Sequence, residues 1–191
     1  MIIRKAKIED AVNLAELVNM AGDGMPYYLW SKIAGPDEDA WEIGRQRAMR
    51  EEGAFSYKNA FIGEENGEVL AAMIGYALAD SPDPTDYQDM PPMFVPLQEL
   101  EGQVPGSWYI NVIAAYPEFR GKGSGSALMN FAESLAIEQN KSRLSLIVSN
   151  ASHAAMRLYS ELGFAMIDKR PMVKEDWQSE GTEWQLMTKS V

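Results

Sequence analysis

The segment that most constrains the fold spans residues 107–135, where a strand, a proline, a glycine-rich turn and a helix follow one another. Residues Ser107–Tyr116 read SWYINVIAAY, and their β-branched and aromatic side chains are typical of a strand. Pro117 ends this strand, because proline has no N–H group to donate to a neighbouring strand. From Leu128 onward apolar residues recur at helical spacing. The segment therefore predicts a strand and a helix joined by a tight turn.

The rest of the chain also alternates between strand and helix patterns, and together they predict one mixed α/β domain over residues 1–191. Within the helix predicted at residues 9–22, one face is expected to carry Val12, Ala15, Leu17 and Val18. Strands are predicted at residues 2–8, 143–150, 165–173 and 182–190, helices at residues 9–22, 37–52 and 152–163, and a hairpin at residues 60–79 with Asn66-Gly67 as its turn.

Residues 80–107 fit neither pattern. They hold six of the ten prolines, and they open with a cluster of acids, DSPDPTDYQD. The segment is predicted to be a long loop, and loops of this length in compact domains are usually functional or mobile.

Composition excludes several classes of site. The chain has no cysteine and one histidine, His153, which excludes disulfides, thiolate sites and histidine-cluster metal sites, so a metal-free protein is expected. Its 17 basic and 28 acidic residues give a net charge of −11, which opposes nucleic-acid binding. This charge favours a cationic partner such as an amine, and it equally serves solubility. The longest apolar run, Val69–Ala79, is too short to span a bilayer, so a cytoplasmic protein without membrane contact is expected.

The glycine-rich turn, EFRGKGSGSALMNFAE from Glu118 to Glu133, suits an anion. The first amides of a helix have no intrahelical acceptor, and the helix dipole adds partial positive charge there. Glycines expose these amides, and Arg120 and Lys122 add charge, which indicates a pyrophosphate cradle. A flexible turn with incidental charges is the alternative. The Walker A and GxGxxG patterns both fail on GKGSGS.

Two linked motifs carry a resemblance to a known family. The first is Arg-x-x-Gly-x-Gly at Arg120, Gly123 and Gly125. The second is LIVSNASHAAMRLYSELGF, which ends in Leu158, Tyr159, Gly163 and Phe164. Over residues 110–164 the sequence resembles the GCN5-related N-acetyltransferases. The resemblance implies a central, mostly antiparallel sheet of about seven strands flanked by about four helices.

The resemblance also implies acetyl-CoA as co-substrate and attack on its thioester by an amine of a small molecule or a peptide. The pantetheine would lie along residues 108–115, and the diphosphate would lie on the amides of the turn. Ser152 stands where the family often has asparagine. A serine can still cap the following helix and offer one hydrogen bond, and Asn150 lies two residues earlier. The implied cofactor-binding residues are Ile113, Ala115, Arg120, Gly121, Lys122, Gly123, Ser124, Gly125, Ser126 and Ser152.

Tyr159 is implied as the general acid that serves the departing thiolate. Its helical spacing with other apolar residues fits a core side chain equally well. The general base stays open among Asp80, Glu99, Glu101, His153 and ordered water, and each carboxylate is more often a solvated surface group.

The acceptor side is less defined. Residues 24–30, GMPYYLW, would line an acceptor pocket or form a hydrophobic lid over the core. The final strands, residues 165–190, would pair across a homodimer, as the resemblance allows. A non-catalytic acyl-CoA-binding sensor on the same fold is the alternative function.

Overall fold

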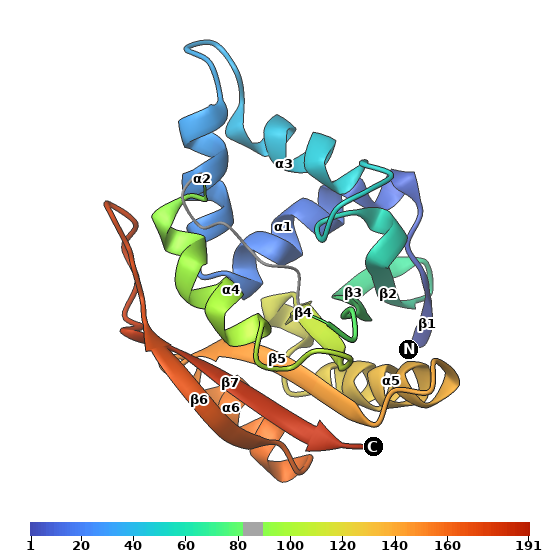
Figure 1. Ribbon diagram of the computed structural model, residues 1–191. Helices are drawn as coiled ribbons and strands as arrows, with labels where there is room; N and C mark the ends of the chain where they lie inside the picture. Colours follow the sequence, from blue (N-terminus) through green and yellow to red (C-terminus); the bar gives the residue numbers. More distant parts are fainter. Residues whose placement is uncertain (82–89) are drawn as a thin grey trace. The chain divides into compact units, whose positions relative to one another are not determined.

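The computed structural model describes residues 1–81 and 90–191 (Figure 1). The chain divides into two compact units. The first unit holds residues 1–75 and 111–131. The second holds residues 76–110 and 132–191. The chain passes from one unit to the other within a strand or a helix each time, so both units are discontinuous in sequence.

Seven strands form one sheet in the order β1-β2-β3-β4-β5-β7-β6. The β1–β2, β2–β3, β5–β7 and β6–β7 pairs are antiparallel, whereas β4 and β5 are parallel. The predicted fold class, a mixed α/β domain with a mostly antiparallel sheet of seven strands, is confirmed. The strands are β1 (Ile2–Lys5), β2 (Ala60–Glu65), β3 (Glu68–Ala77), β4 (Trp108–Ala115), β5 (Arg143–Ser149), β6 (Ala165–Pro171) and β7 (Glu183–Ser190).

The described residues contain six α-helices, two more than predicted. They are α1 (Ala11–Ala21), α2 (Met25–Ile33), α3 (Ala40–Ala48), α4 (Val95–Glu101), α5 (Ser124–Glu138) and α6 (His153–Glu161). The additional helices are α2 and α4. Each has a proline, Pro26 or Pro96, in its first turn, where a missing N–H removes no helical hydrogen bond. The prediction of a continuous loop over residues 80–107 is therefore wrong for α4, while residues 82–89 lie outside the described residues.

In the first unit, α1 buries the side chains that recur at helical spacing, including Leu14, Ala15, Leu17 and Val18. Val12 was predicted on this face, but 48% of it is exposed. The buried side chains at positions 11, 14, 15 and 18 are spaced three to four residues apart and form one face of α1. Position 12 lies outside this face. The β2–β3 turn is as predicted, because Asn66 and Gly67 both have positive φ, 52° and 81°.

In the second unit, the parallel strands β4 and β5 contribute buried side chains to the core. Trp108 pairs with Leu144 and Ile110 with Leu146, and all four side chains are buried. The buried hydroxyls of Ser107 and Ser145 satisfy each other at 2.6 Å. Among the described residues, no helix combines the length and the apolar character that crossing a membrane requires.

β1 ends at Lys5, three residues before its predicted end, because the chain turns there around a buried carboxylate. Arg4 donates to both oxygens of Asp10, at 2.8 Å and 2.9 Å, and the backbone N–H of Lys7 donates to Asp10 at 2.7 Å. Burial alone would raise the pKa of Asp10, but the hydrogen bonds from Arg4 and Lys7 outweigh it and hold the pKa below its usual value. The pair therefore fixes the start of the first unit.

We expect Asp10→Ala to lower the free energy of unfolding by about 1–3 kcal/mol, because Arg4 keeps only Glu64 as a carboxylate partner and the Lys7 N–H loses its acceptor. A lowered carboxyl pKa stabilises the fold above the unfolded value of about 3.9, and this stabilisation is lost as pH falls through the folded value. The free energies of unfolding of wild type and Asp10→Ala, measured by urea titration between pH 3 and pH 7, should therefore converge toward pH 3. Glu9→Gln, at the exposed neighbouring position, is the control. A constant difference at every pH would contradict this account.

Candidate functional site

The glycine-rich turn lies in the first unit, between the end of β4 and the start of α5. A short 3₁₀ turn, Pro117–Phe119, follows β4, and Gly121 and Gly123 then adopt φ values of 71° and 87°. A Cβ added at either glycine would meet no atom within 4 Å. The left-handed backbone, rather than crowding, is therefore what requires glycine at these two positions.

The backbone amides of this turn form the main feature of the site. Arg120 N–H donates to Pro117 O at 3.3 Å, and the next amide with a backbone acceptor is that of Ala127, which donates to Gly123 O at 3.0 Å. Within the described part of the chain, the amides of residues 121–126 between them have no acceptor. Together with the N-terminal end of the α5 dipole, these donors form a surface suited to an anion.

The predicted basic side chains lie on the same turn, and both are exposed. Arg120 donates from Nε to the carbonyl oxygen of Ala115 at 3.1 Å, which ties the turn to the end of β4. The Lys122 ammonium lies 5.4 Å from the centre of the Phe119 ring. The structure thus brings Arg120 into contact with Ala115, another residue of the predicted cofactor set. Ile113, also of that set, is half-buried in β4.

Tyr159 lies in the second unit, on α6. Its side chain is 5% exposed, and its ring packs at 6.1 Å from that of Phe164. Burial raises the pKa of Tyr159 because it disfavours the phenolate. The phenol is therefore firmly protonated at neutral pH, which suits a hydrogen-bond donor and is also what a core tyrosine shows.

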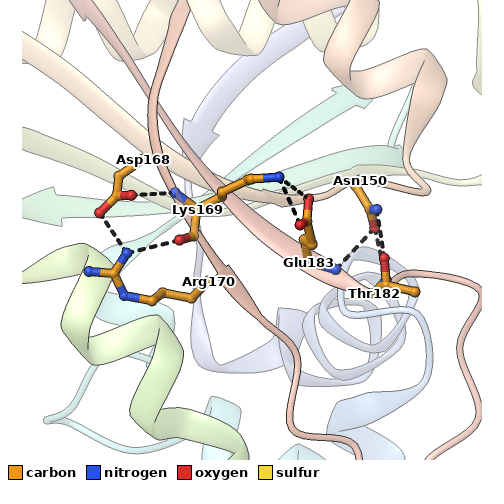
Figure 2. Close-up of polar contacts among 6 residues, drawn as sticks. All are labelled: Asn150, Asp168, Lys169, Arg170, Thr182 and Glu183. Carbon is orange, nitrogen blue, oxygen red and sulfur yellow. Dashed lines mark hydrogen bonds and ion pairs between the residues drawn. The ribbon is translucent and has the colours of Figure 1, made fainter.

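Asn150 and Ser152 differ in what they bind (Figure 2 shows Asn150). The Asn150 amide donates to Thr182 Oγ1 at 2.9 Å, and its oxygen accepts from the Thr182 and Glu183 N–H groups at 2.9 Å and 3.2 Å. These bonds fix the start of β7 beside the end of β5. Ser152 occupies the N-cap position of α6, but its side chain makes no capping hydrogen bond. The Ser152 backbone has ψ 59°, outside the extended conformation that N-cap residues typically adopt.

The candidate bases separate into paired and unpaired groups. Asp80 forms an ion pair with Lys141 at 3.1 Å, and Glu99 forms one with Arg170 at 2.9 Å. His153 is exposed at the start of α6. Glu101 is half-buried at the end of α4, and its side chain has no hydrogen bond or ion pair among the described residues.

The aromatic residues of 24–30 pack within the first unit. Trp30 is buried, and its ring lies 5.9 Å from Trp41 and 6.1 Å from Phe55. Tyr27 is partly exposed and lies 5.0 Å from Trp41. Trp30 therefore belongs to the core, and Tyr27 presents surface. The described residues contain no group of three or more acidic or histidine side chains placed to hold a metal ion.

Comparison with known proteins identifies the family. Residues 26–164 match the model of the Acetyltransferase (GNAT) family. This match covers more than half of the sequence, so the chain belongs to that family, and the resemblance seen in the two motifs is confirmed. No curated protein matches the chain.

Solved structures agree in fold. An N-acetyltransferase from Staphylococcus aureus Mu50 superposes with a TM-score of 0.65 at 18% identity, covering 99% of this chain and 100% of that one. Naa20 from Chaetomium thermophilum, in complex with a bisubstrate analogue, gives 0.63 at 18%, covering 100% and 87%. A Drosophila melanogaster polyamine N-acetyltransferase gives 0.65 at 12%, covering 100% and 99%. Because the sequence identities are this low, the structural similarity establishes the fold alone.

We expect Asn150→Ala to lower the free energy of unfolding by about 1–2 kcal/mol, because two N–H groups at the start of β7 lose their acceptor. Ser152→Ala is the matched control, and it should stay within about 0.5 kcal/mol of wild type since no cap is lost. Chemical denaturation of the three proteins measures both effects. Equal stability of Asn150→Ala and wild type would show that the Figure 2 contacts of Asn150 contribute little.

Proposed function

We propose that the protein transfers the acetyl group of acetyl-CoA to a primary amine of a small molecule or a peptide. The observation that carries this proposal is the run of amides without acceptors at residues 121–126, found in a chain of the GNAT family. Diphosphate oxygens are strong acceptors, and several donors converge where the helix dipole already favours negative charge. Arg120 and Lys122 add two exposed cations to an otherwise acidic chain.

The pantetheine arm is proposed to pair with backbone groups of β4 near Ile113 and Ala115. The Ala115 carbonyl already accepts from Arg120, and its second lone pair stays available. Because the side chain of Asn150 is engaged with β7, Ser152 is the better candidate for a side-chain contact with pantetheine.

The proposed chemistry needs a deprotonated amine and a stabilised leaving group. The amine nitrogen attacks the thioester carbonyl carbon, the carbon–sulfur bond breaks, and the departing thiolate receives a hydrogen bond from the Tyr159 hydroxyl. The pKa of the Tyr159 phenol is raised above its usual value of about 10, whereas a thiol has a pKa of about 8.5. Full proton transfer from the phenol to the thiolate is therefore unfavourable. The proposed role is therefore donation to the charge that develops on sulfur in the transition state.

The acceptor is proposed to be a cationic amine. The net charge of −11 supports this choice, since it attracts cations over a distance. Two structures of the same fold are named for such chemistry, one as a polyamine N-acetyltransferase and one as an agmatine N-acetyltransferase. Short peptides are the alternative acceptors, and the assay below includes them.

A thiol-release assay with acetyl-CoA tests the proposal over polyamines, amino acids, aminoglycosides and short peptides. We expect release with at least one class, and faster release with cationic than with neutral acceptors. Calorimetry of acetyl-CoA binding runs in parallel. Binding without release for any acceptor would support the sensor alternative, and absence of binding would contradict both functions.

We expect Tyr159→Phe to lower kcat by about 100-fold or more, with an unchanged Kd for acetyl-CoA, because only the hydroxyl is removed. The buried ring remains, so thermal unfolding should match wild type. A variant that binds and turns over as fast as wild type would leave Tyr159 as a core residue alone.

A further inference from the structure

Tyr116 stands between the end of β4 and the glycine-rich turn, and its backbone is hydrogen-bonded on both sides. Its N–H donates to the carbonyl oxygen of Leu70 in β3 at 3.0 Å, and its own carbonyl oxygen accepts from the N–H of Phe119 at 2.9 Å. Its φ of −57° and ψ of 145° lie in the region that a residue before proline prefers. Tyr116 therefore ends the strand and opens the turn.

The hydroxyl of Tyr116 is held by α1. It donates to Glu16 Oε2 at 2.5 Å, and it accepts from Asn13 Nδ2 at 3.0 Å. Asn13 and Glu16 are three residues apart in the helix, so they share one face of it. All three side chains are half-buried, and all three residues belong to the first unit. A helix from the start of the chain is thereby joined to the residue that opens the turn.

The contact with Glu16 is of a strong kind, because a hydroxyl donates to a carboxylate. In the part of the chain that the structure describes, the Glu16 side chain has no other hydrogen bond or ion pair. Burial and the hydrogen bond to Glu16 raise the pKa of Tyr116 to about 12. The hydroxyl therefore keeps the proton that it donates to Glu16 at neutral pH.

The turn beyond Tyr116 has few other restraints. Arg120 N–H donates to Pro117 O at 3.3 Å, and Arg120 Nε donates to Ala115 O at 3.1 Å. Gly121 and Gly123 follow with open space around them, and glycine permits many backbone conformations. The direction of the amides of residues 121–126 therefore depends on how firmly the start of the turn is held.

We propose that Tyr116 is a positioning residue for the diphosphate of CoA, held by Glu16 and Asn13 so that the turn stays in the conformation that presents its amides. The inference rests on the cofactor site of the proposed function. A ligand that binds one conformation has an apparent Kd that rises as the population of that conformation falls. Holding the turn in advance also lowers the entropic cost of binding.

The test compares wild type and Tyr116→Phe in the full chain, with the Kd of CoA measured by calorimetry and that of pantetheine by NMR titration. The substitution keeps the ring and removes both hydrogen bonds of the hydroxyl. It should raise the Kd of CoA by about 3- to 10-fold, which is the effect of a lost hydrogen bond. The Kd of pantetheine, which lacks the diphosphate, should stay unchanged. An equal rise for both ligands would overturn the inference, because it would mean general damage to the site.

A matched control is available in the same unit. The Tyr57 hydroxyl donates to Glu51 Oε1 at 2.5 Å, in the 3₁₀ turn that precedes β2. Tyr57→Phe removes the same kind of hydrogen bond from a segment outside the turn. It should leave the Kd of CoA within about twofold of wild type. A rise equal to that of Tyr116→Phe would contradict a specific role for Tyr116.

Variants of Glu16 test whether the hydroxyl acts through this partner. Glu16→Gln keeps an oxygen that can accept from Tyr116, so its Kd for CoA should stay closer to wild type than that of Glu16→Ala. The double variant Glu16→Ala/Tyr116→Phe should bind CoA about as well as Tyr116→Phe alone, because both changes break one contact. Losses that simply add would contradict the coupling.

Thermal unfolding separates positioning from stability. If the contact only stabilised the fold, Tyr116→Phe would unfold at a lower temperature while its folded form bound CoA as wild type does, and the inference would be overturned. Wild type that binds no CoA would overturn the proposed function and this inference together. Wild type that binds CoA but releases no thiol with any acceptor would overturn the proposed function alone, since this inference is measured by binding.

Discussion

Backbone N–H groups without acceptors gather where β4 gives way to α5, and the proposed function depends on them. An amide in water exchanges its hydration for a phosphate oxygen at little cost, whereas a desolvated amide without an acceptor costs about 1–3 kcal/mol. Positive φ at Gly121 and Gly123 shapes the turn that carries these donors. The contact of Arg120 with the Ala115 carbonyl anchors the turn to β4. The donors are thereby held in place before any anion arrives.

In the second unit, burial raises the pKa of the Tyr76, Glu101 and Tyr159 side chains. The pKa of Tyr159 and that of Glu101 are both raised, yet the consequences differ because the ordinary values of the two groups lie on opposite sides of neutrality. Tyr159 keeps its proton and is suited to donate a hydrogen bond. The Glu101 carboxyl keeps its proton to a higher pH than an exposed glutamate does.

The sequence predicted the strands and four of the helices, because apolar periodicity and the Asn66-Gly67 and Pro117 signals are local. It missed α2 and α4, since Pro26 and Pro96 resemble helix breakers until their place in the first turn is known. The candidate site, too, could be predicted only in part. Gly123 is a fixed glycine of the Arg-x-x-Gly-x-Gly motif, whereas Gly121 stands at a variable position, and the positive φ at both is known only from the structure. The ion pairs of Asp80 with Lys141 and of Glu99 with Arg170 could not be predicted, because their partners lie 61 and 71 residues apart in sequence.

The most direct test of the account is an amide NMR titration of the protein with CoA and, separately, with pantetheine, which lacks the diphosphate. Hydrogen bonding to phosphate shifts amide protons, so CoA should move the resonances of residues 121–126 strongly while pantetheine leaves them in place. Saturable CoA binding that leaves these resonances unmoved would contradict the claim that their amides hold the diphosphate.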